Sequence, residues 1–126
     1  MLNIPLRVRN LVRRHGTSDP YRIAKELGCT VMLCDLPEHA NGMWCRILRR
    51  KYIFISDGLE EWQQAAVLCH ELGHIICHPH YQSFSIRCVS YSRTSHEQEA
   101  NDFAEVLMSY RYSCETVYVK KFLEEG

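Results

Sequence analysis

The stretch CHELGHIICH (residues 69–78) places three histidines and one glutamate inside an otherwise apolar run. From Leu59 to about His78, apolar and small residues recur at three- and four-residue steps, which predicts a helix. His70 and His74 are four residues apart, so both rings project from one face of that helix, separated by about 6 Å of rise. Two imidazoles at this spacing can bind one Zn²⁺ ion.

Glu71 follows the first of these histidines directly, turned about 100° from it around the helix. There it can contact a water at the metal and accept its proton without being a ligand. This order of residues, H-E-x-x-H, is that of zinc peptidases. The simpler interpretation is a polar helix face with two partnered histidines. However, His70 and Glu71 interrupt an apolar helix, and burying them without partners would cost several kcal/mol. The sequence therefore favours a metal site with Glu71 as general base.

Two further residues of this helix bear on the site. His78 continues the four-residue series but lies about 12 Å from His70 along the helix axis, too far to share one ion. We expect it near the helix end, where the dipole favours a histidine. Gly73 weakens the helix by about 1 kcal/mol relative to alanine, which predicts that another element approaches closely at this point.

A catalytic zinc usually has three protein ligands, and the best candidate for the third lies in a second predicted helix, HEQEANDFAEVLM (96–108). Glu97 is the only carboxylate on one face of that helix. The same face otherwise carries small or neutral residues: Ala100, Asn101 and Ala104. The alanines allow a close approach that brings Glu97 to the metal, and Asn101 can hydrogen-bond a ligand histidine. Glu99, on the side of Phe103, stays open as the alternative ligand.

Local patterns predict the remaining elements. Helices are expected at LRVRNLVRRHG (6–16) and TSDPYRIAKELG (17–28), each closed by its glycine, and Ser95 is expected to cap the second ligand-bearing helix. Strands are expected at TVMLC (30–34), MWCRILRR (43–50) and KYIFIS (51–56); the last two suggest a hairpin, although no Asn-Gly joins them. We expect a loop with a short strand at residues 80–94, and a helix or strand in the tail from residue 111. Together these elements predict an α+β fold with a short mixed or antiparallel sheet.

Composition limits the function classes. The 126 residues suggest one domain, residues 1–126, and the 15 basic and 15 acidic side chains cancel, which argues against nucleic-acid binding. Four arginines between residues 7 and 14 are expected to form a solvated helix face. No apolar run is long enough to cross a membrane. Seven cysteines without a C-x-x-C spacing indicate reduced, mostly buried thiols and a cytoplasmic protein.

Three segments together resemble the ImmA/IrrE family of metallopeptidases: DPYRIAKELGCTV, AAVLCHELGHIICH and EQEANDFAEVLM, within roughly residues 19–108. The resemblance implies a small gluzincin-like α+β domain in which His70, His74 and Glu97 bind zinc and Glu71 is the general base. Mn²⁺ and Fe²⁺ are alternative metals. It also implies a protein substrate, a helix-turn-helix repressor of a phage, mobile element or stress regulon.

Two questions stay open at this stage. The alternative function is a zinc-stabilised binding module without catalysis that docks to a repressor or toxin, although such a module needs no general base beside its first ligand. The group that stabilises the oxyanion is also undecided among residues in or beside the loop between the motifs: His80, Tyr81, Tyr91 and His96. The sequence does not indicate an oligomeric state.

Overall fold

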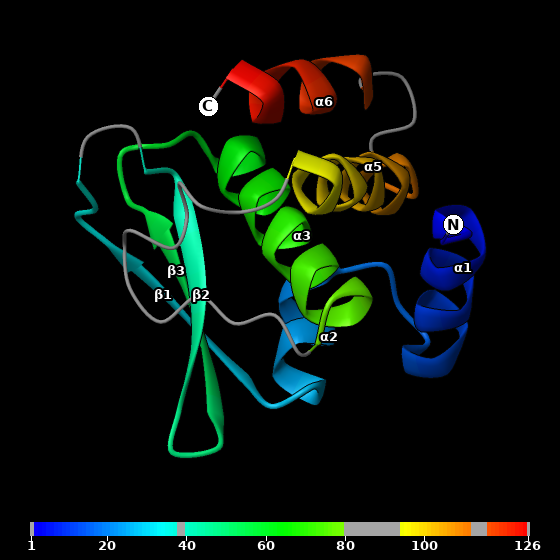
Figure 1. Cartoon of the computed structure of the whole chain (residues 1–126), viewed down its shortest axis with the longest axis horizontal. Helices are drawn as coiled ribbons and strands as arrows, with labels where there is room; N and C mark the ends of the chain where they lie inside the picture. Colours follow the sequence, from blue (N-terminus) through cyan, green and yellow to red (C-terminus); the bar gives the residue numbers. More distant parts are fainter. Residues whose placement is uncertain (1, 38–39, 80–93, 112–115, 126) are drawn as a thin grey trace.

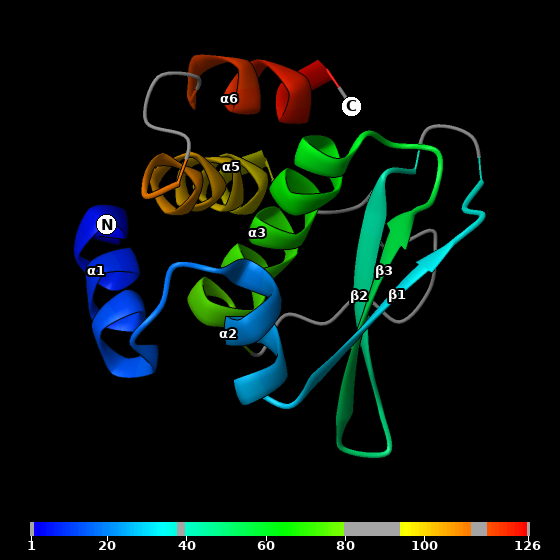
Figure 2. The ribbon, with the colours of Figure 1, turned by 180° about the vertical axis from the view of Figure 1, so that it is seen from behind.

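The computed structural model describes residues 2–37, 40–79, 94–111 and 116–125, which form a small sheet with helices packed beside it (Figure 1). In chain order the elements are α1 (Ile4–His15), α2 (Pro20–Glu26), β1 (Cys29–Cys34), β2 (Gly42–Ile47), β3 (Arg50–Ser56), α3 (Glu61–Cys77), α5 (Thr94–Ser109) and α6 (Thr116–Glu125). The predicted α+β fold with a short mixed sheet is confirmed, and the sheet packs on α3, the helix that carries H-E-x-x-H. Seen from behind, α2 lies beside α3, between the sheet and α1 (Figure 2).

The three strands form a mixed sheet in the order β1-β3-β2. The central strand β3 pairs in parallel with β1 and antiparallel with β2. Ile53 of β3 is aligned with Val31 of β1 and with Trp44 of β2, so these three side chains share one face. Ile53 and Trp44 are buried, and both β2 and β3 contact α3. The sheet therefore uses this face to support the helix that carries H-E-x-x-H.

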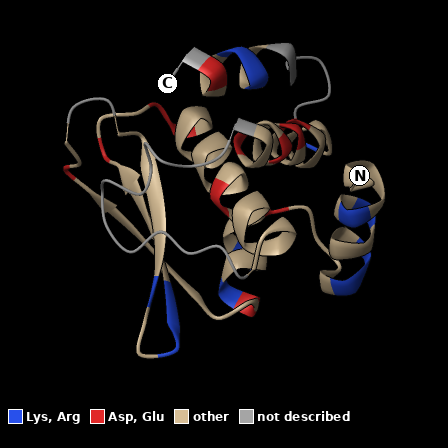
Figure 3. Ribbon diagram, in the orientation of Figure 1, with Lys and Arg blue, Asp and Glu red and all other residues tan. Residues whose placement is uncertain are grey.

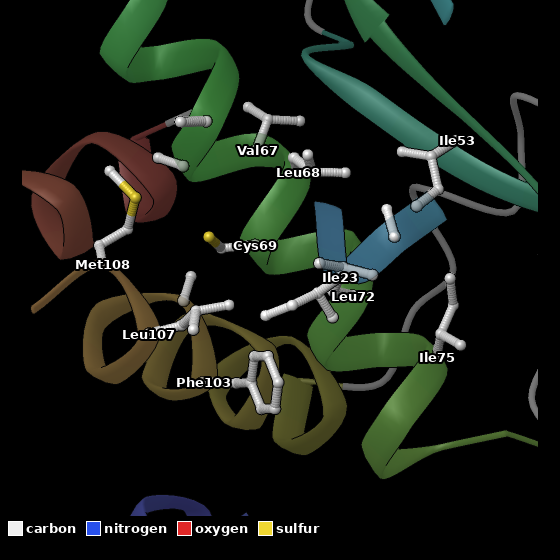
Figure 4. Close-up of a cluster of buried hydrophobic side chains, with 14 of the residues drawn as sticks. Ile23, Ile53, Val67, Leu68, Cys69, Leu72, Ile75, Phe103, Leu107 and Met108 are labelled. Carbon is white, nitrogen blue, oxygen red and sulfur yellow. The ribbon is translucent and has the colours of Figure 1, made fainter. Parts of the chain in front are cut away.

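Helix α3 is the centre of the core. Its buried residues include Ala65, Ala66, Cys69 and Leu72, which follow the predicted three- and four-residue spacing. Figure 4 shows α3 residues packed between Ile53 of the sheet, Ile23 of α2, and Phe103 and Leu107 of α5. The helix begins where Gln63 Oε1 accepts the Glu60 N–H at 3.0 Å, and it ends at Cys77, two residues before Pro79.

Capping residues define the ends of the first two helices, and α1 begins at Ile4, two residues before the expected Leu6. Asn3 Oδ1 accepts the Leu6 N–H at 3.2 Å at the start of α1, and Asp19 Oδ1 accepts the Tyr21 N–H at 3.0 Å at the start of α2. Gly16, with φ of 69°, closes α1 in the left-handed conformation. At the end of α2 the cap itself is Leu27, and the left-handed glycine follows one residue later.

The structure corrects one boundary and decides one open element in the second half of the chain. Helix α5 begins at Thr94, so Ser95 lies inside the helix and is not its N-cap. Sequence patterns place a helix end only to within one or two residues, so a serine near the start does not fix the cap position. The tail forms helix α6, whose Lys120 Nζ lies 3.1 Å from Asp102 Oδ1 of α5. The loop predicted at residues 80–94 falls almost entirely outside the described residues.

The thiol prediction holds for the cysteines that the structure describes. All five are free, and all but Cys34 are buried: Cys29, Cys45, Cys69 and Cys77. Burial raises the pKa of the Cys77 thiol to about 11, which keeps it protonated near neutral pH. Cys88 and Cys114 lie outside the described residues. Within the described ranges, no helix combines the length and apolarity that crossing a bilayer requires.

The predicted hairpin is present, but the first strand is shorter than expected. Ile47 pairs with Arg50, so the strand predicted over residues 43–50 ends early and Leu48 and Arg49 form a two-residue turn. Both turn residues have positive φ, 49° and 72°, as in the tight turns that usually contain Asn-Gly. A left-handed conformation costs a non-glycine residue roughly 1–2 kcal/mol, so this turn is strained. No local pattern indicated this turn, because neither leucine nor arginine is typical of such turns.

Replacing the strained pair with Asn-Gly should stabilise the protein. The double variant Leu48→Asn with Arg49→Gly fits positive φ, and we expect the free energy of unfolding to rise by about 1 kcal/mol. For a chain of this size the melting temperature should rise by roughly 3–5 °C, measured by circular dichroism. The matched control, with alanine at both positions, removes the same side chains but keeps the strain, and should not stabilise. A double variant no more stable than the parent would show that the turn is unstrained.

Candidate metal centre

Helix α3 presents His70 and His74 on the same side, as their spacing predicts. The ring centroids are 4.7 Å apart with the planes nearly perpendicular, at 86°. The two Nε2 atoms face each other at 3.1 Å. Both side chains are largely withdrawn from solvent. The nitrogen atoms that could bind a metal therefore converge on one point.

Glu97, in the first turn of α5, completes the cluster. Its Oε2 lies 3.0 Å from His70 Nε2 and 3.1 Å from His74 Nε2. In a tetrahedral site with bonds of about 2.0–2.1 Å, neighbouring ligand atoms lie about 3.3 Å apart. The observed separations are close to that value, so the three donors fit a zinc ion with little rearrangement. Among the residues that the structure describes, this is the one group of three or more potential ligands gathered closely enough to hold a metal.

A close contact between the two helices brings Glu97 to the histidines. A Cβ atom on Gly73 would lie 3.0 Å from Phe103 Cβ and 3.2 Å from both the Cα and the carbonyl oxygen of Ala100. These distances leave almost no room for a side chain, which confirms the close approach that Gly73 predicts. Ala100 is one turn after Glu97 and fully buried, so the contact sets the position of the carboxylate.

Glu71 lies beside the cluster without belonging to it. Its Oε2 is 4.0 Å from His70 Nε2, and the residue is only 6% exposed. Burial raises the pKa of the Glu71 carboxyl, while the charges of His70 and His74 act in the opposite direction. A carboxylate in this environment binds a proton more readily than one in water, which suits a general base.

The sequence patterns did not single out Gly42, which adjoins Glu71. A Cβ atom on Gly42 would collide with Val67 Cγ1 and would lie 3.7 Å from Glu71 Oε2. The first residue of β2 must therefore be glycine for the strand to pass this close to α3. Gly42 stands in a segment that looks like a turn in the sequence, and no local signal indicates its contact with residues about 25 to 29 positions later.

Opposite charges compensate for the burial of the ligand set. Burial alone would raise the pKa of Glu97, but the hydrogen bonds from His70 and His74 outweigh it and hold that pKa far below its usual range. Burial likewise acts to lower the pKa of His70, yet the hydrogen bond to Glu97 and the charge of Glu71 raise it overall. Asn101, which is buried, adds to this effect. Asn101 Oδ1 and His70 Nδ1 lack hydrogen-bond partners within the described residues, so these two atoms do not bond to each other.

The residues considered as alternatives lie together, away from the three ligand atoms. Glu99 Oε1 is 3.1 Å from His78 Nε2, and the His78 ring stacks on His96 with centroids 3.8 Å apart. Glu99 therefore faces the end of α3, whereas Glu97 faces the middle. Of the four candidates for stabilising an oxyanion, His96 packs against His78, and the other three lie outside the described residues: His80, Tyr81 and Tyr91.

Comparison with known proteins agrees with this geometry. A family model described as the IrrE N-terminal-like domain, peptidase M78, matches residues 24–115. A relative named "Uncharacterized immunity region protein 2", from Bacillus phage phi105, is 32% identical over 102 residues, covering 80% of this chain and 65% of that protein. A second, named "Metallopeptidase ImmA", from Bacillus subtilis (strain 168), is 27% identical over 124 residues, covering 94% of this chain and 72% of that protein. The chain thus spans just under two thirds of the phage relative's length. No solved structure matches significantly.

Removal of one histidine should distinguish the ligands from the outer residue. In His70→Ala, one of three donors is lost, so we expect metal affinity to fall by more than the roughly 10–100-fold that follows loss of a supporting residue. His78→Ala should keep most of the metal, because its Nε2 faces Glu99. Elemental analysis of the purified proteins after dialysis measures both. A fully metallated His70 variant would show that the metal binds elsewhere.

The two carboxylates of α5 offer a matched pair of variants. Glu97→Gln removes a charged donor 3.0–3.1 Å from both histidine nitrogens, so zinc affinity should fall by orders of magnitude. Glu99→Gln makes the same chemical change on the neighbouring carboxylate and should alter affinity little. Competition with a chromogenic chelator gives both dissociation constants. The reverse ranking would assign the third ligand to Glu99.

Proposed function

Because the chain belongs to the ImmA/IrrE family of metallopeptidases, we propose that it is a zinc-dependent endopeptidase that cuts a protein substrate. The observation that carries this proposal is the position of Glu71, a buried carboxylate 4.0 Å from a candidate ligand nitrogen and outside the ligand set. A metal that only stabilises a fold needs no such group. A metal that catalyses hydrolysis needs a base at this position.

His70, His74 and Glu97 are the proposed metal ligands. Two neutral imidazoles and one carboxylate are a donor set that catalytic zinc sites use, with a fourth position left for water or substrate. When bound, zinc supplies Lewis-acid chemistry, which polarises a peptide carbonyl and makes a water acidic near neutral pH. The same donors also accept Mn²⁺ or Fe²⁺, so the metal found will depend on its supply.

Glu71 is the proposed general base. Its Oε2 takes a proton from the attacking water, and the same carboxyl can then give that proton to the amine that leaves when the peptide bond breaks. Gly42 leaves open the space beside this carboxylate, where an added Cβ atom would lie 3.7 Å from Glu71 Oε2.

The proposed substrate is a helix-turn-helix repressor encoded beside the gene. The phage relative carries the words "immunity region" in its name. The family resemblance of the two helix motifs implies the same substrate class. We propose that cleavage relieves repression, in the cytoplasm and without direct contact between this protein and nucleic acid.

Replacing Glu71 with glutamine should separate binding from catalysis. Glutamine keeps the shape of the side chain but cannot accept the proton, so cleavage of the repressor should slow by roughly 10²–10⁴-fold. Zinc content should stay near that of the parent, because Glu71 is not among the proposed ligands. The measurement is the rate at which purified repressor is cut, with and without chelator, alongside elemental analysis.

Glu99→Gln is the control for this experiment, since it makes the same chemical change on a carboxylate that faces His78. It should cut at close to the parental rate. If Glu71→Gln also cuts at the parental rate, the mechanism proposed for Glu71 is wrong. If neither the parent nor the variant cuts but both relieve repression, the protein is a binding module and not a peptidase.

A further inference from the structure

The end of the β2–β3 hairpin carries an isolated positive charge. The hairpin tip, defined here as residues 46–51 (RILRRK), contains four basic residues and no acidic one, in a chain with formal net charge zero. Figure 3 shows this blue end projecting beyond the helices. None of its four basic side chains takes part in an ion pair with the rest of the described chain. Among the described residues, the charge of the tip is therefore not compensated by any acidic side chain.

The same tip exposes apolar side chains at its outermost point. Leu48 is 92% exposed, and the adjacent Ile47 is 51% exposed. A single exposed leucine is ordinary on a protein surface. Here, however, the leucine lies at the end of a projecting turn, directly beside Arg49 and Arg50, so apolar surface and positive charge are exposed together.

The conformation of the hairpin tip is locally unfavourable in two respects. Leu48 and Arg49 both occupy the left-handed region, where glycine or asparagine would be far more favourable. One step back along the hairpin, Arg46 pairs directly with Lys51, and like charges directly opposite each other repel. Two local conflicts in six residues are expected where a surface is selected for contact and not for stability.

We propose that the hairpin tip docks an acidic surface of the protein substrate, with Leu48 seated in an apolar recess between carboxylates. This inference rests on the proposed function. Strand β2 runs from Gly42, which adjoins Glu71, to Ile47 at the tip, five steps of about 3.4 Å or roughly 17 Å in all. A folded protein can contact the tip while one of its peptide bonds reaches Glu71, whereas a short peptide at Glu71 leaves the tip free.

A protein fits the tip better than the other polyanions. Phosphate contacts along a nucleic acid would use the arginines but would leave the exposed leucine in water. One leucine and a half-exposed isoleucine bury far less apolar area in a bilayer than the acyl chains or amphipathic helices that attach proteins to membranes. An acidic protein surface with an apolar recess satisfies both the charge and the leucine.

The test compares a folded substrate with a short one. The repressor encoded beside the gene and a synthetic peptide spanning its cut site are each given to the parent, to R49E/R50E and to L48N/R49G. We expect both tip variants to lose about 10–100-fold in kcat/KM on the repressor, mainly through KM, because the docking contacts are lost. Cleavage of the peptide should not change. R9E/R13E, which makes the same charge change on exposed residues of α1, is the matched control and should cut both substrates normally.

The variant L48N/R49G excludes misfolding as the cause of a lower kcat/KM, because it is expected to be more stable than the parent although it lacks the Leu48 side chain. The proposal would be overturned if the tip variants lost kcat/KM equally on repressor and peptide, or lost it on neither. It would also be overturned if R9E/R13E lost as much kcat/KM on the repressor as the tip variants do. So would loss of binding to phosphatidylglycerol vesicles or to duplex DNA in tip variants that still cut the repressor normally.

Failure of the docking proposal can be told from failure of the peptidase proposal. If the parent cuts the repressor and the tip variants cut it equally well, only the docking proposal fails. If the parent binds the repressor without cutting it, the peptidase proposal fails. The docking proposal is then decided by the affinity of the tip variants for the repressor, which should be lower than that of the parent. If the parent neither binds nor cuts the repressor, the two proposals fall together.

Discussion

The contact between Gly73 of α3 and Ala100 of α5 is the constraint on which the candidate site depends. Because a Cβ atom at this point would lie only 3.0–3.2 Å from atoms of α5, the glycine lets α5 pack closely against α3 with this face toward it. One turn earlier on that face, Glu97 meets both histidine nitrogens, while Glu99 is directed to His78 at the end of α3. The cost of a glycine inside a helix is offset by the ligand geometry that it makes possible.

Charge balance is the second condition of the site. His70, Glu71 and Glu97 are all largely withdrawn from water, and each alone would be costly to bury. Their mutual arrangement offsets part of that cost: the histidines hold Glu97 ionised, and the carboxylates favour the charged form of His70. A divalent cation placed among these donors would take over this balancing role from protons. Metal supply is therefore expected to affect folding stability as well as activity.

The sequence predicted those parts that depend on periodicity and on motif spacing. The helices around His70 and Glu97 follow from residues at three- and four-residue steps, and the choice of Glu97 follows from the small residues that share its face. The features that the sequence did not predict depend on contacts between distant residues. The approach of Gly42 to Glu71 and the parallel pairing of β1 with β3 have no local signal. The turn at Leu48–Arg49 was missed because its residues contradict the turn that they form.

The hairpin tip has a consequence for how such a protein can diversify. Its six residues are contiguous in the chain, and Ile47 to Arg50 contribute no side chain to the buried core. Because they lie apart from α3 and α5, changes to them leave the packing around Gly73 intact. Mutation can therefore explore new partners at the tip one codon at a time, while selection on the catalytic helices proceeds independently. A fold arranged in this way separates the evolution of recognition from the evolution of chemistry.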